Sequence, residues 1–285
     1  MKSPRKFLGF DVTRDWLMRP LFGLGLAAIA IAATYYGGFW FVAFIAVGAS
    51  AAAREWHRMW AGSDYLWLSV ISIVAIVAST AGEVLVVHAN PGFLGVPWLI
   101  LAGGGVLNLA LSFTRGRTMF WHAASVLYIG LPALCLVAIR EVPANGVWEL
   151  FALFFAVWLT DTGALITGNL LKGPKLWPAL SPNKTWSGSL GGAAAGAFAA
   201  AIVFLVLHAN PWHGAVLGLG ASVIGQVGDL FESFLKRKVG RKNSGSLIPG
   251  HGGVLDRIDS MLFVAPVAAL FFLVLNIDPF VLGAP

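Results

Sequence analysis

Two acidic pairs flank a basic, glycine-rich segment near the end of the chain. Asp229 and Glu232 are three residues apart where one apolar stretch ends, and Asp256 and Asp259 repeat that spacing where the next begins. This spacing puts both carboxylates of a pair on one helix face. Two such pairs facing each other can hold a hard cation through oxygen ligands. Glycine lets backbone N–H groups approach phosphate, and Lys and Arg neutralise it. The residue types therefore predict binding of a cation and a phosphate compound.

A plainer interpretation of the same segment has to be weighed. Asp229 and Glu232 would pair with Lys236 and Arg237 on a solvated helix end, and the basic run 236–242 would orient the chain and contact anionic lipid. Piece by piece this interpretation is the stronger one. Taken together, four acids, paired glycines and a histidine exceed what orientation requires, so we expect a functional site.

A second polar segment lies between residues 160 and 188. Asp161 stands inside an apolar stretch, where an ionisable group is costly and marks function by default. A salt bridge to a neighbouring helix is the alternative. The run from Ser181 through Asn183 and Lys184 to Thr185 offers hydroxyls, an amide and an ammonium in a tight turn, which suits phosphate binding. Ser181 or Thr185 as an ordinary helix N-cap would explain the hydroxyl but not Lys184.

The composition of the chain indicates that the elements carrying these residues lie in a membrane rather than in water. The 285 residues are 58% hydrophobic and 11% charged, with a mean hydropathy of +0.80, whereas a soluble domain carries about 25% charged residues. This excludes a cytosolic globular enzyme, a disordered tail and a secreted disulfide scaffold. The lone Cys135 excludes an intrachain disulfide and a cysteine metal site. Continuous Ala-, Leu- and Val-rich runs without alternation argue against a β-barrel and predict an all-α, polytopic transmembrane protein.

The apolar runs predict about nine membrane segments, because a helix needs roughly 20 apolar residues to cross the hydrocarbon core. The first two are separated only by 35–38 and are either two tilted spans or one re-entrant hairpin. The predicted segments are 20–34, 39–53, 66–88, 96–113, 119–139, 147–168, 188–208, 213–230 and 260–278.

The placement of positive charge supports this count. With the N-terminus on the cytoplasmic side, 18 of the 19 lysines and arginines fall in inner segments and only Arg140 falls outside, as the positive-inside rule requires. We therefore expect a protein of the inner (cytoplasmic) membrane whose site faces the cytoplasm. The net charge of +6 is accounted for by basic loops that face anionic lipid headgroups. No nucleic-acid partner is therefore expected.

Polar residues divide the chain into two regions. Residues 1–140 hold few of them and are predicted to be lipid-facing support helices. Residues 141–285 are predicted to be the catalytic membrane region, with cytoplasmic loops at 169–187 and 231–259.

The run 233–259 resembles the signature of the CTP:phosphatidate cytidylyltransferases, also called CDP-diacylglycerol synthases. The segments 225–233, 161–163 and 181–185 are similar to further elements of that family, and the close resemblance covers about 155–265. The positions of this chain that fit the signature are Ser233, Lys236, Arg237, Lys242, Gly245, Ile248, Pro249, His251, Gly252, Gly253, Asp256, Arg257 and Asp259.

The resemblance implies a reaction of CTP with phosphatidate at a membrane surface, with Mg²⁺ between phosphate oxygens and enzyme carboxylates; a second cation and a homodimer are left open. It implies metal-linked acids at Asp229, Asp256, Asp259, Glu232 and Asp161. It implies catalytic residues that contact phosphate or donate a hydrogen bond at Lys184, Lys236, Arg237, Lys242, His251 and Arg257. It implies substrate-binding residues at Ser181, Asn183, Thr185, Ser233, Gly250, Gly252 and Gly253.

Two positions depart from the family pattern. Asn243 replaces an Asp and Ser187 stands where an acid is usual, so a catalytically weak paralogue is one alternative. A membrane transporter is another, but transporters place coupling groups near the bilayer midplane, and here most charges gather at one face. The pattern of the CDP-alcohol phosphotransferases is absent, and a CTP-using polyprenol kinase is expected to lack the full run from Lys236 to Asp259.

Overall fold

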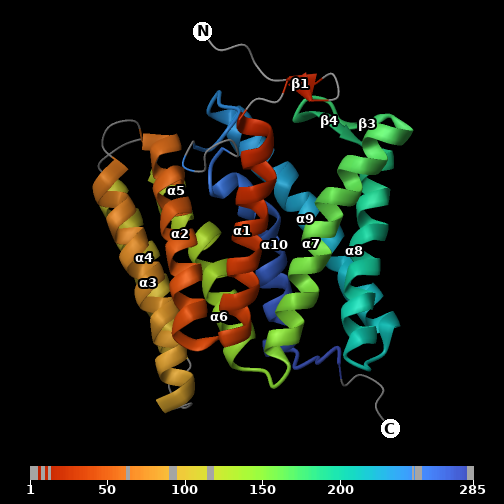
Figure 1. Cartoon of the computed structure of the whole chain (residues 1–285). Coiled ribbons are helices and arrows are strands. Elements are labelled where there is room, and N and C mark those ends of the chain that lie inside the picture. The colour runs from red at the N-terminus through yellow and green to blue at the C-terminus, as the bar shows by residue number, and fades with distance from the viewer. Residues whose placement is uncertain are drawn as a thin grey trace.

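A computed structural model of the chain describes residues 6–7, 10–11, 14–61, 65–89, 95–113, 119–245, 247 and 252–280. Within these residues the protein is a bundle of nine helices (Figure 1), which confirms the predicted all-α membrane class. The helices are α1 (Arg14–Tyr36), α2 (Gly38–Ala61), α3 (Tyr65–Ala89), α4 (Val96–Ser112), the continuous α5 (Met119–Ser125), η3 (Val126–Gly130) and α6 (Leu131–Glu141), α7 (Gly146–Leu171), α8 (Trp186–Val206), α9 (Pro211–Lys238) and the continuous α10 (Leu255–Ala269) and η4 (Leu270–Val274).

Two small sheets stand beside the helices. The strands β1 (Lys6–Phe7) and β2 (Phe10–Asp11) pair antiparallel, as do β3 (Lys175–Trp177) and β4 (Ser181–Thr185). The second pair forms a hairpin between α7 and α8, where the sequence predicted only a loop. It matters for function because β4 carries the polar run that begins at Ser181.

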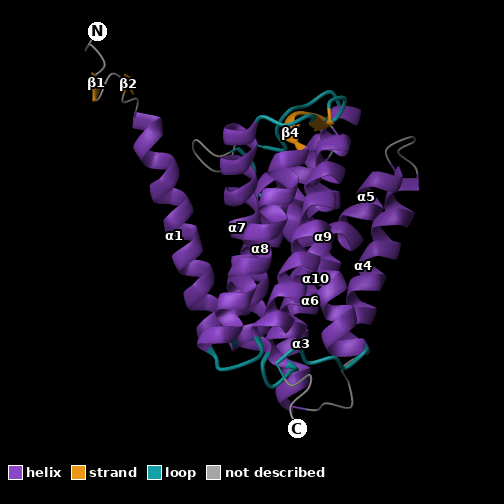
Figure 2. Ribbon diagram, turned by 90° about the vertical axis from the view of Figure 1, so that its right-hand side faces the viewer, coloured by secondary structure: helices purple, strands orange, loops and turns teal. Residues whose placement is uncertain are grey.

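Seven of the described helices are long and apolar enough to cross a membrane, and the apolar helical stretches Gly23–Tyr36 and Val96–Ser112 are shorter. The chain is therefore an integral membrane protein. The open question about the first two segments is answered in part: α1 and α2 are separate helices joined at Gly37, whose φ of +64° lets the chain reverse. In Figure 2, α1 leans away from the other helices toward its N-terminal end.

Successive helices alternate in direction, so the loops fall into two sets at opposite ends of the bundle. The strand β4, the beginning of α1 and the end of α7 lie at one end, and the end of α1 lies at the other (Figure 2). We call the end with β4 the site end. The described parts of the predicted inner segments lie at this end, and Lys2, Arg5, Arg115 and Arg117 lie outside the described residues. Arg140 lies near the end of α6, at the opposite end.

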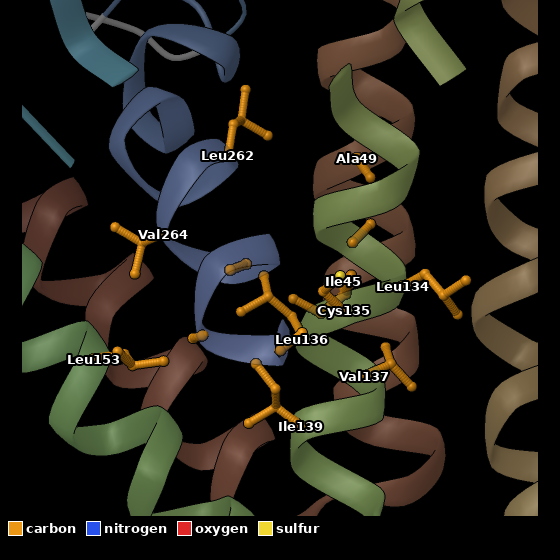
Figure 3. Close-up of a cluster of buried hydrophobic side chains, with 14 of the residues drawn as sticks. Ile45, Ala49, Leu134, Cys135, Leu136, Val137, Ile139, Leu153, Leu262 and Val264 are labelled. Atoms are coloured by element: carbon orange, nitrogen blue, oxygen red, sulfur yellow. The ribbon is translucent and has the colours of Figure 1, made fainter. Parts of the chain in front are cut away.

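The helix α6 forms the centre of the bundle. Every residue from Pro132 to Ile139 is buried, and a helix that is apolar all round has to be surrounded by other helices. Figure 3 shows its side chains in one cluster of buried hydrophobic residues with Ile45 and Ala49 of α2, Leu153 of α7, and Leu262 and Val264 of α10. The core therefore joins the N-terminal and C-terminal halves of the chain.

Small residues bring α7, α8 and α9 close together. A Cβ at Gly192 would lie 2.7 Å from the Thr160 carbonyl oxygen, and one at Gly214 would lie 2.6 Å from the Ala200 carbonyl oxygen. Membrane helices approach closely through such positions, because lipid supplies no hydrophobic force between them. This packing fixes α9, which carries several of the predicted site residues.

The last inner loop is shorter than predicted. The helix α9 continues to Lys238 and α10 begins at Leu255, whereas the hydropathy pattern placed the loop at 231–259. Charged Glu, Lys and Arg end an apolar run, yet they are good helix formers, so hydropathy underestimated both helices. Glu232, Lys236 and Arg237 consequently stand on α9, and Asp256 and Asp259 stand on the first turns of α10.

Candidate active site

The candidate site lies at the site end, where the β3–β4 hairpin meets the last turns of α9. A cavity of about 410 Å³ opens between them. Its lining includes three cationic side chains, those of Lys236, Arg237 and Lys242. Ligand pockets typically occupy about 300–1,000 Å³, so the cavity suits a small polyanion. Its full lining is Leu180, Ser181, Pro182, Asn183, Ser233, Lys236, Arg237, Lys242 and Asn243.

This cavity brings together the two segments that the sequence singled out. Ser181 and Asn183 come from the first segment, and Ser233, Lys236 and Lys242 come from the second. Their convergence does not follow from either segment alone. Asn243, the departure from the family pattern, lies in the same wall.

The hairpin is fixed by short-range contacts. The helix α7 ends at Leu171, its C-cap Lys172 has a left-handed φ of +45°, and Gly173 and Pro174 follow. Thr185 is the N-cap of α8, since its hydroxyl accepts from the Gly188 N–H at 3.1 Å, as the plainer interpretation of that residue expected. The Ser187 hydroxyl accepts from the Gly173 N–H at 3.1 Å and so ties the end of α7 to the start of α8.

Lys184 of β4 joins the hairpin to α9 through an ion pair. Its ammonium group forms an ion pair with the carboxylate of Asp229. Asp229 therefore does not use the lysine of its own helix end, as the plainer interpretation expected, but a residue brought from β4. The ion pair places a cation and an acid side by side close to the cavity.

A second ion-pair group joins α9 to α10. Lys236 Nζ lies 2.7 Å from Asp256 Oδ1 and 3.4 Å from Glu232 Oε1. The Glu232 side chain is fully buried, and neither of its oxygens has a hydrogen-bond partner. Lys236 thus neutralises two acids while it lines the cavity.

Backbone N–H groups complete the surroundings of Asp256. The Ser244 N–H lies 3.2 and 3.1 Å from its two oxygens, and the Gly253 N–H donates to Oδ2 at 3.0 Å. Gly252 has a φ of +89°, and a Cβ there would lie 3.1 Å from Asp256 Oδ2, so this position favours glycine. In this state the Gly253 N–H serves the protein's own carboxylate, and phosphate binding by Gly252 and Gly253 stays a prediction.

The other acids lie within electrostatic reach of one another. Asp161 of α7 interacts with Asp229, Lys184 and Arg257, and Asp259 interacts with Asp229 and Asp161. Among the described residues, no three His, Cys, Asp or Glu side chains converge as a preformed metal site. The candidate donors are carboxylate oxygens, including those of the buried Glu232, which fits Mg²⁺ chemistry. Because Mg²⁺ is often bound by one or two carboxylates plus substrate phosphates, the missing ligands would come from the substrate.

Two of the predicted residues, Gly250 and His251, lie outside the described residues. Their assignments stay predictions, as do the roles assigned to the other site residues.

Glu55 of α2 was not among the predicted site residues. This carboxylate is buried, with 6% of the residue exposed, and its Oε2 accepts from the Leu255 N–H at 3.0 Å and from the Ser244 hydroxyl at 3.3 Å. Arg54 and Arg58 on either side were used only for orientation. The available signal was a lone acid between Arg54 and Trp56, where a long apolar stretch ends.

An apolar helical bundle with a cationic cavity and ion-paired acids at one end defines a membrane-embedded protein that acts on phosphate compounds. Residues 17–275 match the Cytidylyltransferase family, and the chain belongs to that family. It is 40% identical over 257 residues to a phosphatidate cytidylyltransferase of Brucella suis, which covers 86% of this chain and 89% of the relative. A phosphatidate cytidylyltransferase of Staphylococcus haemolyticus is 39% identical over 217 residues, 72% of this chain and 82% of the relative. One of Staphylococcus epidermidis is 36% identical over 201 residues, 68% and 74% respectively.

Proposed function

We propose that this protein is a phosphatidate cytidylyltransferase, which joins CTP to phosphatidate and releases pyrophosphate. Relatives of that name align with this chain over most of their length. The observation that carries the proposal is the cationic cavity, because it gathers Lys236, Arg237 and Lys242 where the β3–β4 hairpin meets the end of α9, at one end of a membrane bundle. A nucleoside triphosphate brings several negative charges, and these three cations offset them.

The chemistry needs little from the protein beyond position and charge. An anionic phosphate oxygen of phosphatidate attacks the α-phosphorus of CTP and forms a new P–O bond. The bond from the α-phosphorus to its bridging oxygen breaks, and pyrophosphate leaves with the electron pair. The nucleophile is already ionised, so no Ser, Cys or general base is required. Holding two polyanions together is the task, and it depends on orientation and electrostatic stabilisation.

The chain's own residues divide this task. Lys236, Arg237 and Lys242 bind the triphosphate in the cavity, with Ser181 and Asn183 orienting it from the hairpin. Lys184 and Asp229 flank the reacting phosphates. Bound Mg²⁺ would supply further charge neutralisation, held by oxygens of Asp229 and its acidic neighbours together with those of CTP. The apolar bundle leaves phosphatidate's acyl chains in the bilayer, so only its headgroup has to reach the site.

The site end faces the cytoplasm of the inner membrane in this proposal. The described basic residues of α2, the hairpin and α9 gather at that end, and positive loops are retained on the cytoplasmic side. Arg241→Cys tests the orientation, because Arg241 is exposed at that end. A membrane-impermeant maleimide should label it in inverted vesicles and not in intact cells; the opposite result refutes the orientation.

The activity is tested with purified protein in detergent micelles, given labelled CTP and phosphatidate with and without Mg²⁺. We expect label in CDP-diacylglycerol and an equal amount of pyrophosphate. Arg237→Ala should lower kcat/KM for CTP by about 10²-fold, since it removes a charge that meets phosphate. Arg241→Ala is the matched control, because Arg241 lies on the same segment but not in the cavity lining. Absence of lipid-linked cytidine from the wild type refutes the proposal and leaves a transporter as the alternative.

A further inference from the structure

The carboxylate of Glu55 connects the first half of the bundle to the loop between α9 and α10. Its Oε2 accepts from the N–H of Leu255, the first residue of α10, at 3.0 Å, and from the Ser244 hydroxyl at 3.3 Å. A negative charge at a helix N-terminus is favourable, because the first N–H groups of a helix have no partner within it. One buried side chain thus holds both ends of the loop's described part.

The glycines of this loop leave the space that the Glu55 carboxylate occupies. A Cβ at Gly245 would lie 2.6 Å from the carboxyl carbon of Glu55, and a Cβ at Gly253 would lie 2.5 Å from its Oε2. Contacts this short do not occur at real Cβ atoms. A larger residue at Gly245 or Gly253 would therefore clash with Glu55. This steric requirement explains glycine at both positions without any contact to phosphate.

Contacts lead from Glu55 to the cavity. The Ser244 hydroxyl donates to Glu55, and the Ser244 N–H lies 3.2 and 3.1 Å from the two oxygens of Asp256. Asp256 in turn accepts from Lys236, which lines the cavity. Asn243, next to Ser244, lines it as well. Displacing Ser244 would therefore displace cationic and polar groups that meet the ligand.

The position of Glu55 is itself well fixed. The neighbouring Trp56 donates its indole N–H to the Trp121 carbonyl at 2.6 Å. His57 lies in a buried network, with Nδ1 3.0 Å from Nδ1 of His122 and Nε2 2.9 Å from the Ser72 hydroxyl. These contacts join the end of α2 to α3 and α5. Glu55 thus stands on a support independent of the loop that it holds.

We propose that Glu55 is a positioning residue of the nucleotide site, which fixes Ser244 and the start of α10 so that Asp256 and Lys236 are set for CTP. The inference rests on the proposed function. It gives α2, in the half of the chain predicted to be support, an indirect part in nucleotide binding. Glu55 makes no contact with the cavity, so its effect passes through Ser244 and Asp256.

The chain offers a closely matched control in Glu141. Its side chain is 6% exposed, and its Oε1 accepts from the N–H of Gly38, the first residue of α2, at 2.7 Å. It therefore makes the same kind of contact, a buried carboxylate on a helix N-terminus, at the opposite end of the bundle. Glu55→Gln and Glu141→Gln each remove one charge that accepts from a helix N-terminus, and Glu141 in addition lies 3.9 Å from Arg140 and His88.

Two measurements on the full chain in detergent micelles test the inference. In Glu55→Gln, amide hydrogen exchange at Ser244, Gly253 and Leu255 should be faster by about tenfold. The KM for CTP should rise by about tenfold or more, because small displacements of binding groups are costly. Glu55→Asp should restore part of both. Glu141→Gln should lower the unfolding temperature and leave loop exchange and the KM for CTP within about twofold of wild type.

The outcomes separate the inference from the function on which it rests. Wild-type protein without product refutes the proposed function, and the positioning role with it. Active wild type with unchanged loop exchange in Glu55→Gln refutes only the inference. Faster exchange with unchanged KM and kcat also overturns it, since Glu55 would then stabilise the loop without setting the nucleotide site.

Discussion

Replacing Lys236 by methionine removes the positive charge that two acids share. Lys236 Nζ lies 2.7 Å from Asp256 Oδ1 and 3.4 Å from Glu232 Oε1, and the two acidic side chains are 11% and 0% exposed. Methionine keeps most of the length and apolar character of the lysine stem, so the change is mainly electrostatic. Glu232 would be left buried without the cation that now pairs with it.

The burial of the two acids sets the size of the expected loss in the free energy of unfolding. Removing one partner of a buried ion pair costs about 3–5 kcal/mol, because the other charge stays out of water without compensation. An exposed pair is worth about 0–1 kcal/mol. We therefore expect Lys236→Met to lower the free energy of unfolding by about 3–5 kcal/mol. Glu232→Gln, added to Lys236→Met, should recover part of that loss, since it removes one of the two uncompensated charges.

Unfolding in mixed micelles of increasing SDS content, followed by tryptophan fluorescence and circular dichroism, measures this free energy. Lys238→Met is the control, because Lys238 is exposed and its ammonium contacts only aromatic rings in the contacts described, 4.6 Å from the centroid of the Trp121 ring. Such a contact is worth about 0.5–1 kcal/mol at an exposed site. A loss in Lys236→Met no larger than that in Lys238→Met would refute the reasoning. So would a double variant no more stable than Lys236→Met.

Three further predictions concern activity and packing. Lys184→Met should lower kcat by about 10²–10³-fold, since it removes a cation beside Asp229 that meets the reacting phosphates; steady-state assays measure this. Asn243→Asp adds a carboxylate to the cavity wall and should lower the Mg²⁺ concentration for half-maximal activity, measured by Mg²⁺ titration. Gly253→Ala should lower both the unfolding temperature and activity, because its Cβ would lie 2.5 Å from a carboxylate oxygen. Gly220→Ala, inside α9 where nothing lies within 4 Å of the added Cβ, should lower neither, because alanine is the better helix former.

Each of these has an outcome that contradicts it. Wild-type turnover in Lys184→Met would remove that residue from the reaction. An unchanged Mg²⁺ requirement in Asn243→Asp would show that the residue does not meet the cation. Equal effects of the two alanine substitutions would mean that the loop around Gly253 is not closely packed.

The membrane helices were predictable because a helix in hydrocarbon must be both long and apolar. The segment 66–88 matches the helix that ends at Ala89, and 147–168 lies within α7. The helix ends were not predictable from the same signal, since hydropathy falls at Asp229 while the backbone stays helical to Lys238. Ion pairs such as Glu232–Lys236 support the helix there.

The individual residues of the candidate site were predictable from the sequence, but the contacts between them were not. The sequence singled out both Lys184 and Asp229 and had no means of joining them, because their ion pair depends on how the β3–β4 hairpin lies against α9. Glu55 was missed for the same reason, since its hydrogen-bond partner Leu255 is 200 residues away along the chain. Contacts of this range depend on packing, and the pattern of one segment contains no information about them.

The hydrogen bond between Glu55 and the first residue of α10 has a consequence for biosynthesis. Ribosomes insert this chain from its N-terminus, so α2 enters the bilayer long before Leu255 has been synthesised. Until the last helix arrives, the Glu55 carboxylate has no Leu255 N–H to accept from, and Ser244 has no Asp256 to hold. Chains released after eight helices would resemble the finished protein in hydropathy and lack its catalytic geometry. Maturation of the site is thus the final event of assembly.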